Sequence, residues 1–294
     1  MKFGYLPENQ SYKTDFFRIE PLDEIWTIVK AVTSDGFIHD GWFYPPAEEP
    51  LSNINNLTKA PKIPWVAFGL PSTHRIEIIG EQNDEFCEFI INLFGFIRGL
   101  KLIPEKWLHF YRVAVDPNKL VGFHCSTHEV IEILNLGCEY YFKNINKNLN
   151  RLLFGAIHWH MFSHSYLHDF ERFDCQYKVL DTCYRIVEEA FGIKSKNHAG
   201  RPVALCKLFE MPVPHWAVIS NKNSYLSNLR NNLLHEAQFA NEPIGFGTPD
   251  PSIVFQLTNL NAKFILSILG IKAKYIEYPA DKEFCLHALD MCEH

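Results

Sequence analysis

The chain has 294 residues, enough for one large domain or two modest ones, each with its own hydrophobic core. Its 47% hydrophobic and 21% charged residues are typical of a folded protein in water. The net charge of −6 excludes a broad electrostatic grip on nucleic acid, which requires a basic domain or stripe, but it leaves room for a small positive cleft.

The N-terminal residues, the longest apolar run and the cysteines predict a soluble cytoplasmic protein with no membrane partner. Residues 1–8 lack the apolar region of a signal peptide. The most apolar run, residues 86–97, is too short to span a bilayer and contains Glu88. The cysteines include no C-x-x-C pair, and several fall on apolar helix faces, so we expect them to be reduced core residues. They are Cys87, Cys125, Cys138, Cys175, Cys183, Cys206, Cys285 and Cys292.

Residues 1–125 have the texture of a β-rich domain. Short runs of β-branched and aromatic residues alternate with turn signals such as Ser34-Asp35-Gly36. Five prolines in residues 45–64 indicate a loop. Residues 86–100 fit a buried helix or a strand, and periodicity does not decide between them. The candidate strands are residues 25–32, 37–44, 65–68, 75–79 and 108–115.

This N-terminal part is rich in aromatic residues. They have the chemistry to stack bases or to grip a partner. In a β-rich domain, however, such residues are more often core and cross-strand pairs, and Asp40 stands where a basic residue would favour RNA. We therefore predict a core role. The residues are Trp26, Phe37, Trp42, Phe43, Tyr44, Trp65 and Trp107.

From residue 126 onward the apolar pattern takes the period of helices. Ser126 or Thr127, followed by acidic residues, marks the first helix start, and Gly192 marks a helix end. The sequence thus predicts a two-domain α+β protein, with a β-rich domain over residues 1–125 and an all-α bundle over 126–294. The expected helices span residues 127–143, 149–166, 168–191, 202–209, 220–236 and 252–269.

The helix over 220–236 carries the strongest chemical motif. Leu226, Leu229 and Leu233 recur at helical spacing and predict an apolar stripe. Asn231 and His235 are four residues apart and share a nearly opposite face. Arginine offers a planar, permanently charged fork for a phosphoryl oxygen, and histidine exchanges a proton near neutral pH. With Arg230 the set is typical of a site that acts on phosphate.

Arg-polar-x-x-x-His on a late helix of an α-helical domain resembles the signature of the HEPN family, closest to its Apea-like branch. The apolar helix that follows and Glu171-Arg172-Phe173 upstream fit the same pattern. The resemblance covers the C-terminal half of the chain. It implies a metal-independent endoribonuclease of a toxin or anti-phage defence system, with RNA as substrate. It also implies a homodimer in which two motif helices face each other, and an N-terminal domain that senses a protein or phage-derived trigger.

Under this resemblance His235 is the acid/base group, Arg230 stabilises the charge on the phosphoryl oxygens, and Asn231 positions the substrate. Glu171 and Glu236 are supporting candidates, Glu171 because acidic residues on its helix can lie near the motif in the family. The structural alternative is a solvated helix end, with Glu171 favoured simply by a helix N-terminus. The functional alternative is a non-catalytic HEPN-like module that binds nucleotides or acts as a scaffold.

A second cluster of histidines stands on the helix over 149–166. His160, His164 and His168 follow each other at i, i+4 and i+8, and His158 precedes them, so neighbours could share a metal or a phosphate. No H-E-x-x-H motif and no clear carboxylate or cysteine ligand accompanies them. The wet face of an amphipathic helix is the favoured interpretation. Since phosphate-binding Gly loops and G-x-S-x-G are also absent, we expect no metal and no cofactor.

Overall fold

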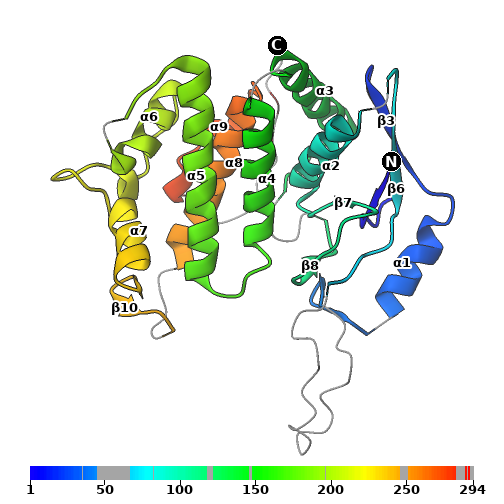
Figure 1. Ribbon diagram of the computed structural model, residues 1–294, viewed down its shortest axis with the longest axis horizontal. Coiled ribbons are helices and arrows are strands. Elements are labelled where there is room, and N and C mark those ends of the chain that lie inside the picture. Colours follow the sequence, from blue (N-terminus) through cyan, green and yellow to red (C-terminus); the bar gives the residue numbers. More distant parts are fainter. Residues whose placement is uncertain are drawn as a thin grey trace, which may run out of the picture. The chain divides into compact units, whose positions relative to one another are not determined.

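The computed structural model describes residues 1–34, 36–44, 67–81, 83–117, 122–145, 148–195, 197–245, 251–282, 289 and 291. The chain divides into two compact units, Met1–Gly122 and Phe123–His294. In its described part the first unit combines antiparallel sheets with helices, and the second is mainly helical (Figure 1). The predicted α+β class is confirmed.

The first unit is built on a five-stranded antiparallel sheet in the order β2-β3-β6-β1-β7. Helix α2, Asp84–Arg98, packs against β6 and β7, where its Phe94 ring meets Phe3 and Tyr12 edge-on. Asn83 caps the start of α2, and Gly99 ends it in the left-handed conformation, so these local signals make the segment helical from Asp84 to Arg98. The strands are β1 Lys2–Gly4, β2 Tyr12–Lys13, β3 Phe17–Pro21, β6 His74–Ile78 and β7 Ile103–Pro104.

A three-stranded sheet, β4-β5-β8, completes this unit together with helix α1. Its strands are β4 Ile38–His39, β5 Trp42–Phe43 and β8 Val113–Ala114, and α1 spans Ile25–Ser34. The predicted strand at 25–32 is wrong. Ile25 and Val32 are buried and seven residues apart, a helical repeat that β-branched composition conceals. Phe68 forms only an isolated bridge with His109, and the predicted loop at 45–64 lies outside the described residues.

The aromatic residues of this unit divide into two groups. Trp42 and Phe43 are buried, which confirms the core role predicted for them. Trp26, Phe37 and Trp107 are 57%, 38% and 40% exposed, so for these three the prediction is wrong. Trp26 stands on the exposed side of α1, and Phe37 and Trp107 lie outside the strands, which composition alone does not indicate. Trp65 lies outside the described residues.

The second unit is a helical bundle organised around α5, which packs against α4, α6, α7 and α8. In Figure 1 α5 stands between α4 and the α6–α7 pair. Ser126 caps α3 in a reciprocal capping box with Glu129, and Gly192 ends α5, as the sequence predicted. The helices are α3 Thr127–Lys143, α4 Leu149–Ser163, α5 Asp169–Phe191, α6 Arg201–Leu208, α7 Tyr225–His235, α8 Pro251–Ile268 and α9 Lys274–Glu277. Short elements are η2 His198–Gly200, η3 His215–Ala217, β9 Gln238–Phe239, β10 Glu242–Pro243 and η4 Ala280–Lys282.

Polar side chains hold the interior of this bundle together. Asn261 of α8 donates to the Gln176 carbonyl and Oε1, both at 2.8 Å, and Gln176 donates to the Ser163 hydroxyl at 2.7 Å and the His160 carbonyl at 3.4 Å. We call His160, Ser163, Gln176 and Asn261 the buried network. All four are at most 2% exposed. Because Gln176 of α5 is bonded both to α8 and to α4, the network sets the register of α4, α5 and α8.

The cysteines follow the sequence prediction within the described residues. Cys87, Cys138, Cys175, Cys183 and Cys206 are buried free thiols, and Cys125 is half-buried. Burial raises the pKa of Cys175 to about 11 and that of Cys138 to about 12, so these thiols stay protonated. Cys285 and Cys292 lie outside the described residues.

Candidate functional site

Helix α7 carries the predicted motif. Ser224 caps it: its hydroxyl accepts from the Ser227 amide at 3.2 Å, and its own amide donates to the Ser227 hydroxyl at 2.8 Å. Leu226 and Leu229 are buried and Leu233 is half-buried, which confirms the apolar stripe. The helix starts at Tyr225 and not at residue 220, because residues 220–223 form a turn closed by a bridge.

Arg230 and Asn231 come together on this helix. The Arg230 Nη1 donates to the Asn231 Oδ1 at 3.1 Å, and both side chains are half-buried. The guanidinium carbon also lies 5.9 Å from the centre of the Tyr177 ring on α5. Two independent contacts thus hold the guanidinium, and a positioned arginine is a better phosphate ligand than a free one.

His235 and Glu236 stand at the other end of the helix. His235 is exposed on the last turn, and its side chain forms no hydrogen bond or ion pair with another described residue. Glu236 is the C-cap, whose amide donates to the Asn232 carbonyl at 3.0 Å. The Arg230–Asn231 pair is therefore held by neighbours, whereas His235 projects from the helix end into solvent.

Glu171 lies at the start of α5. Its Oε2 accepts from the His168 amide at 3.4 Å and completes a capping box. Among the described residues no contact joins Glu171 to Arg230 or His235. Its observed partner is the helix start, as in the structural alternative.

Asp181, His198 and Arg201 complete the surroundings of Arg230. Asp181 of α5 holds the Arg201 Nη1 at 2.7 Å through Oδ1, and its Oδ2 lies 3.7 Å from the His198 Nδ1. We call Asp181, His198, Arg201 and Arg230 the charged cluster. The positive charges of Arg201 and Arg230 both lower the pKa of His198, after burial, the largest cause. The cluster combines two guanidinium groups with one carboxylate, a local positive site in an acidic chain.

Sequence reasoning missed His198 and Arg201 for a physical reason. They lie in the polar segment between the predicted helices over 168–191 and 202–209. Their proximity to Arg230 arises only when α6 and α7 pack on α5. The available local signal is Asn197 before a short turn and Pro202 near a helix start. That pattern predicts the turn and gives no indication of its neighbours.

The histidine cluster of α4 is structural. His160 is 2% exposed, and its ring meets His164 at 5.8 Å in a T-shaped contact. His158 stacks between Phe154 and Phe162, while His168 caps α5. The predicted wet face is wrong for His160, which is buried because α4 packs against both α5 and α8, whereas His168 is exposed at the start of α5. Burial lowers the pKa of His160 to about 4. Among the described residues no group of histidine, cysteine and acidic side chains is placed to hold a metal.

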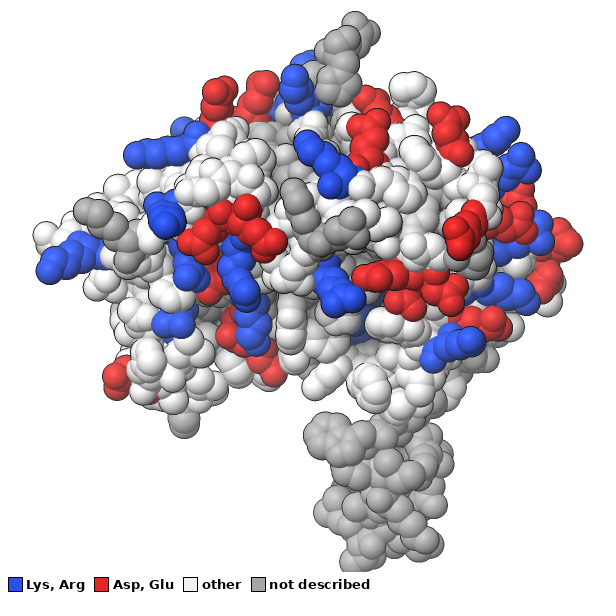
Figure 2. All heavy atoms as spheres, turned by 45° about the horizontal axis from the view of Figure 1, so that its top comes forward, with Lys and Arg blue, Asp and Glu red and all other residues white. Residues whose placement is uncertain are grey.

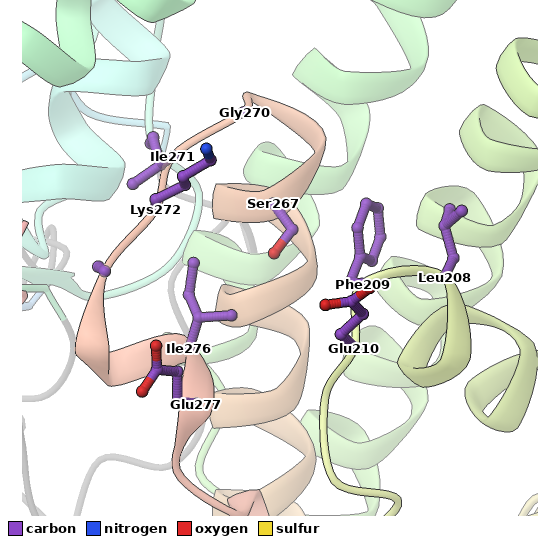
Figure 3. Close-up of a pocket in the computed structure, with 10 residues that line it drawn as sticks. Leu208, Phe209, Glu210, Ser267, Gly270, Ile271, Lys272, Ile276 and Glu277 are labelled. Atoms are coloured by element: carbon purple, nitrogen blue, oxygen red, sulfur yellow. The ribbon is translucent and has the colours of Figure 1, made fainter. Parts of the chain in front are cut away.

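A cavity of about 610 Å³ opens between the C-terminal ends of α6 and α8 and helix α9 (Figure 3). Its lining combines the apolar Phe209, Ile271 and Ile276 with the charged Glu210, Lys272 and Glu277. It lies at the end of α6 opposite Arg201 and contains none of the predicted site residues.

Comparison with known proteins gives no relative for this chain: no family model, curated protein or solved structure matches it significantly. On the face shown in Figure 2, lysines and arginines alternate with acidic residues and do not form a continuous basic band. Within the described part of the chain, no helix combines the length and apolarity needed to cross a bilayer.

Proposed function

We propose that this protein is a metal-independent endoribonuclease of the HEPN type. The observation that carries the proposal is the Arg230 guanidinium, positioned by Asn231 and Tyr177 and accompanied by Arg201 in the charged cluster. Phosphoryl transfer needs fixed positive donors where charge builds on the non-bridging oxygens. A half-buried arginine with two constraints supports that role better than a mobile surface lysine would.

In the proposed reaction the ribose 2′-hydroxyl attacks the adjacent phosphorus. Arg230 stabilises the developing charge, Asn231 orients the arginine and the phosphate, and His235 exchanges a proton with a reacting oxygen. The products are a 2′,3′-cyclic phosphate and a 5′-hydroxyl. Water is then needed only for later opening of the cyclic phosphate.

The proposed setting follows from the same family. The enzyme would act in the cytoplasm as a toxin or anti-phage effector, as a homodimer with paired motif helices. Its N-terminal unit would respond to a protein or phage-derived trigger. The exposed position of His235 at a helix end is compatible with such pairing.

The test is cleavage of a labelled RNA in EDTA by the wild type and by Arg230→Ala and His235→Ala. We expect each substitution to lower the rate by about 10²- to 10⁴-fold, the usual contribution of one positioned donor or acid/base group. The cut ends should carry 2′,3′-cyclic phosphate. Arg185→Ala is the matched control, since Arg185 is an exposed arginine of α5 outside the charged cluster. Cleavage that persists in both variants would refute the assignment.

A nucleotide-binding module is the competing function. The observation that favours it is the exposure of His235 on the single chain, away from the contacts that hold Arg230. This alternative predicts that the wild type binds nucleotides without cleaving RNA. Arg230→Ala would then weaken binding, whereas His235→Ala would leave it unchanged.

A further inference from the structure

The turn that carries His198 is anchored to two helices by the residues that precede it. Asn197 caps η2 by accepting from the Gly200 amide at 3.0 Å, and its Nδ2 donates to the Lys222 carbonyl at 3.2 Å, just before α7. Ser195 donates its hydroxyl to the Asn197 carbonyl at 2.8 Å and its amide to the Tyr184 hydroxyl of α5 at 2.5 Å. The position of His198 is thereby fixed relative to both α5 and α7.

The charges around His198 come from each helix that packs against its turn. They are Asp181 of α5, Arg201 of α6 and Arg230 of α7. Burial and the two arginines lower the pKa of His198, and Asp181 opposes them. The imidazole is therefore mostly neutral at pH 7. The Asp181 carboxylate lies 3.7 Å from Nδ1, an arrangement that favours the neutral tautomer with its proton on Nδ1 and Nε2 as the acceptor.

Solvent reaches this histidine although its partners are partly covered. The His198 side chain is 47% exposed, against 27% for Asp181 and 23% for Arg201. A carboxylate behind the ring, an open imidazole and fixed guanidinium groups are the parts of a general-base site for a phosphodiester. The 3.7 Å separation from Asp181 is in the range that tightens when a substrate binds.

We propose that His198, oriented by Asp181, is the general base of this enzyme and acts in the same chain as Arg230. The inference rests on the proposed ribonuclease function and supplies the second proton-transfer group that one His235 per chain does not provide. The family resemblance would take that group from a second copy of the chain. In this proposal the group is His198 of the same chain as Arg230.

The proton and bond changes balance as follows. The His198 Nε2 takes the 2′-hydroxyl proton while the O2′–P bond forms. The P–O5′ bond breaks, and the leaving 5′-oxygen takes a proton from the His235 imidazolium. Arg201 and Arg230 stabilise the extra charge on the phosphoryl oxygens. Proton exchange with water restores both histidines.

The experiment is the pH profile of single-turnover RNA cleavage in EDTA by wild type, His198→Gln and Asp181→Asn. We expect His198→Gln to lower the rate by about 10²- to 10⁴-fold and to remove the acid limb, which reports the base. Asp181→Asn should retain more activity and move that limb to lower pH, because the carboxylate raises the pKa of His198. If Asp181 had only a structural role, Asp181→Asn would lower the rate without moving the acid limb along the pH axis.

His215→Gln is the matched control. His215 also pairs with a carboxylate, with its Nδ1 2.9 Å from the Asp281 Oδ2, but it lies outside the charged cluster. It should cleave like the wild type. Circular dichroism and affinity for an uncleavable 2′-O-methyl RNA check that His198→Gln folds and still binds.

Mixing two inactive variants tests whether the groups act in one chain. His198→Gln mixed with His235→Ala should remain inactive if one chain needs both histidines, whereas recovered cleavage would show that they act across two chains and would overturn the inference. A cleavage rate of His198→Gln within about threefold of the wild-type rate would also overturn the inference, but the ribonuclease proposal would stand. Absence of any wild-type cleavage would refute both.

Discussion

The buried network and the charged cluster use similar side chains for opposite purposes. In the network Gln176 and Asn261 direct their hydrogen bonds to other helices of the bundle, and water is excluded. In the cluster one carboxylate, Asp181, lies between the Arg201 guanidinium and the His198 ring, and that ring stays half-exposed. Polar groups committed to bonds between helices stabilise the fold, whereas those with open positions are available to a substrate.

The largest loss of stability is expected from substitution of Lys263, a buried lysine of α8. The Lys263 Nζ donates to the carbonyls of Tyr275 at 2.6 Å and Tyr278 at 2.5 Å, and the side chain is 1% exposed. We expect Lys263→Ala to lower the free energy of unfolding by about 3 kcal/mol, since it leaves a cavity and removes a charged donor from two carbonyls. Urea denaturation measures this. Lys272→Ala, at an exposed lysine, should change it by less than about 0.5 kcal/mol.

Acid should weaken the fold through His160. Its pKa is lowered from 6.5 to about 4 by burial, so between these pH values the unfolded chain binds a proton that the folded chain does not. Stability is therefore lost as pH falls through this window, by up to about 1.4 kcal/mol per pH unit for one such group.

His160→Gln should accordingly reduce the pH dependence of the free energy of unfolding between pH 6.5 and 4. His198→Gln should reduce it less, because Asp181 offsets part of the lowering of the His198 pKa. If the free energy of unfolding depended equally on pH in the two variants, the contrast between the buried network and the charged cluster would be contradicted. Urea denaturation at half-unit pH intervals measures both.

The smallest effect on stability is expected in the charged cluster. Arg201→Ala should lower the free energy of unfolding by less than about 1 kcal/mol, because its ion pair with Asp181 is partly solvated. The same variant should move the acid limb of RNA cleavage to higher pH, since Arg201 lowers the pKa of His198. A loss of stability as large as that of Lys263→Ala would assign Arg201 to the structural interior.

The sequence by itself determined what depends on near neighbours in the chain. Ser126 with Glu129 and the glycine at Gly192 mark helix ends through backbone groups within a few residues. The Leu226–Leu229 stripe and the Arg230–Asn231 pair are also local. These features gave the helical half and one part of the candidate site.

Only the tertiary structure decided which faces meet. Helix α1 looked like a strand because β-branched residues dominate it, and its buried face is defined by packing. The His160 ring looked solvated until α5 and α8 covered α4. The turn of His198 packs against α6 and α7, so that the charge of Arg230 acts on His198, and no spacing along the chain records that packing. Burial and long-range charge depend on the whole fold, whereas caps and stripes depend on one turn of helix.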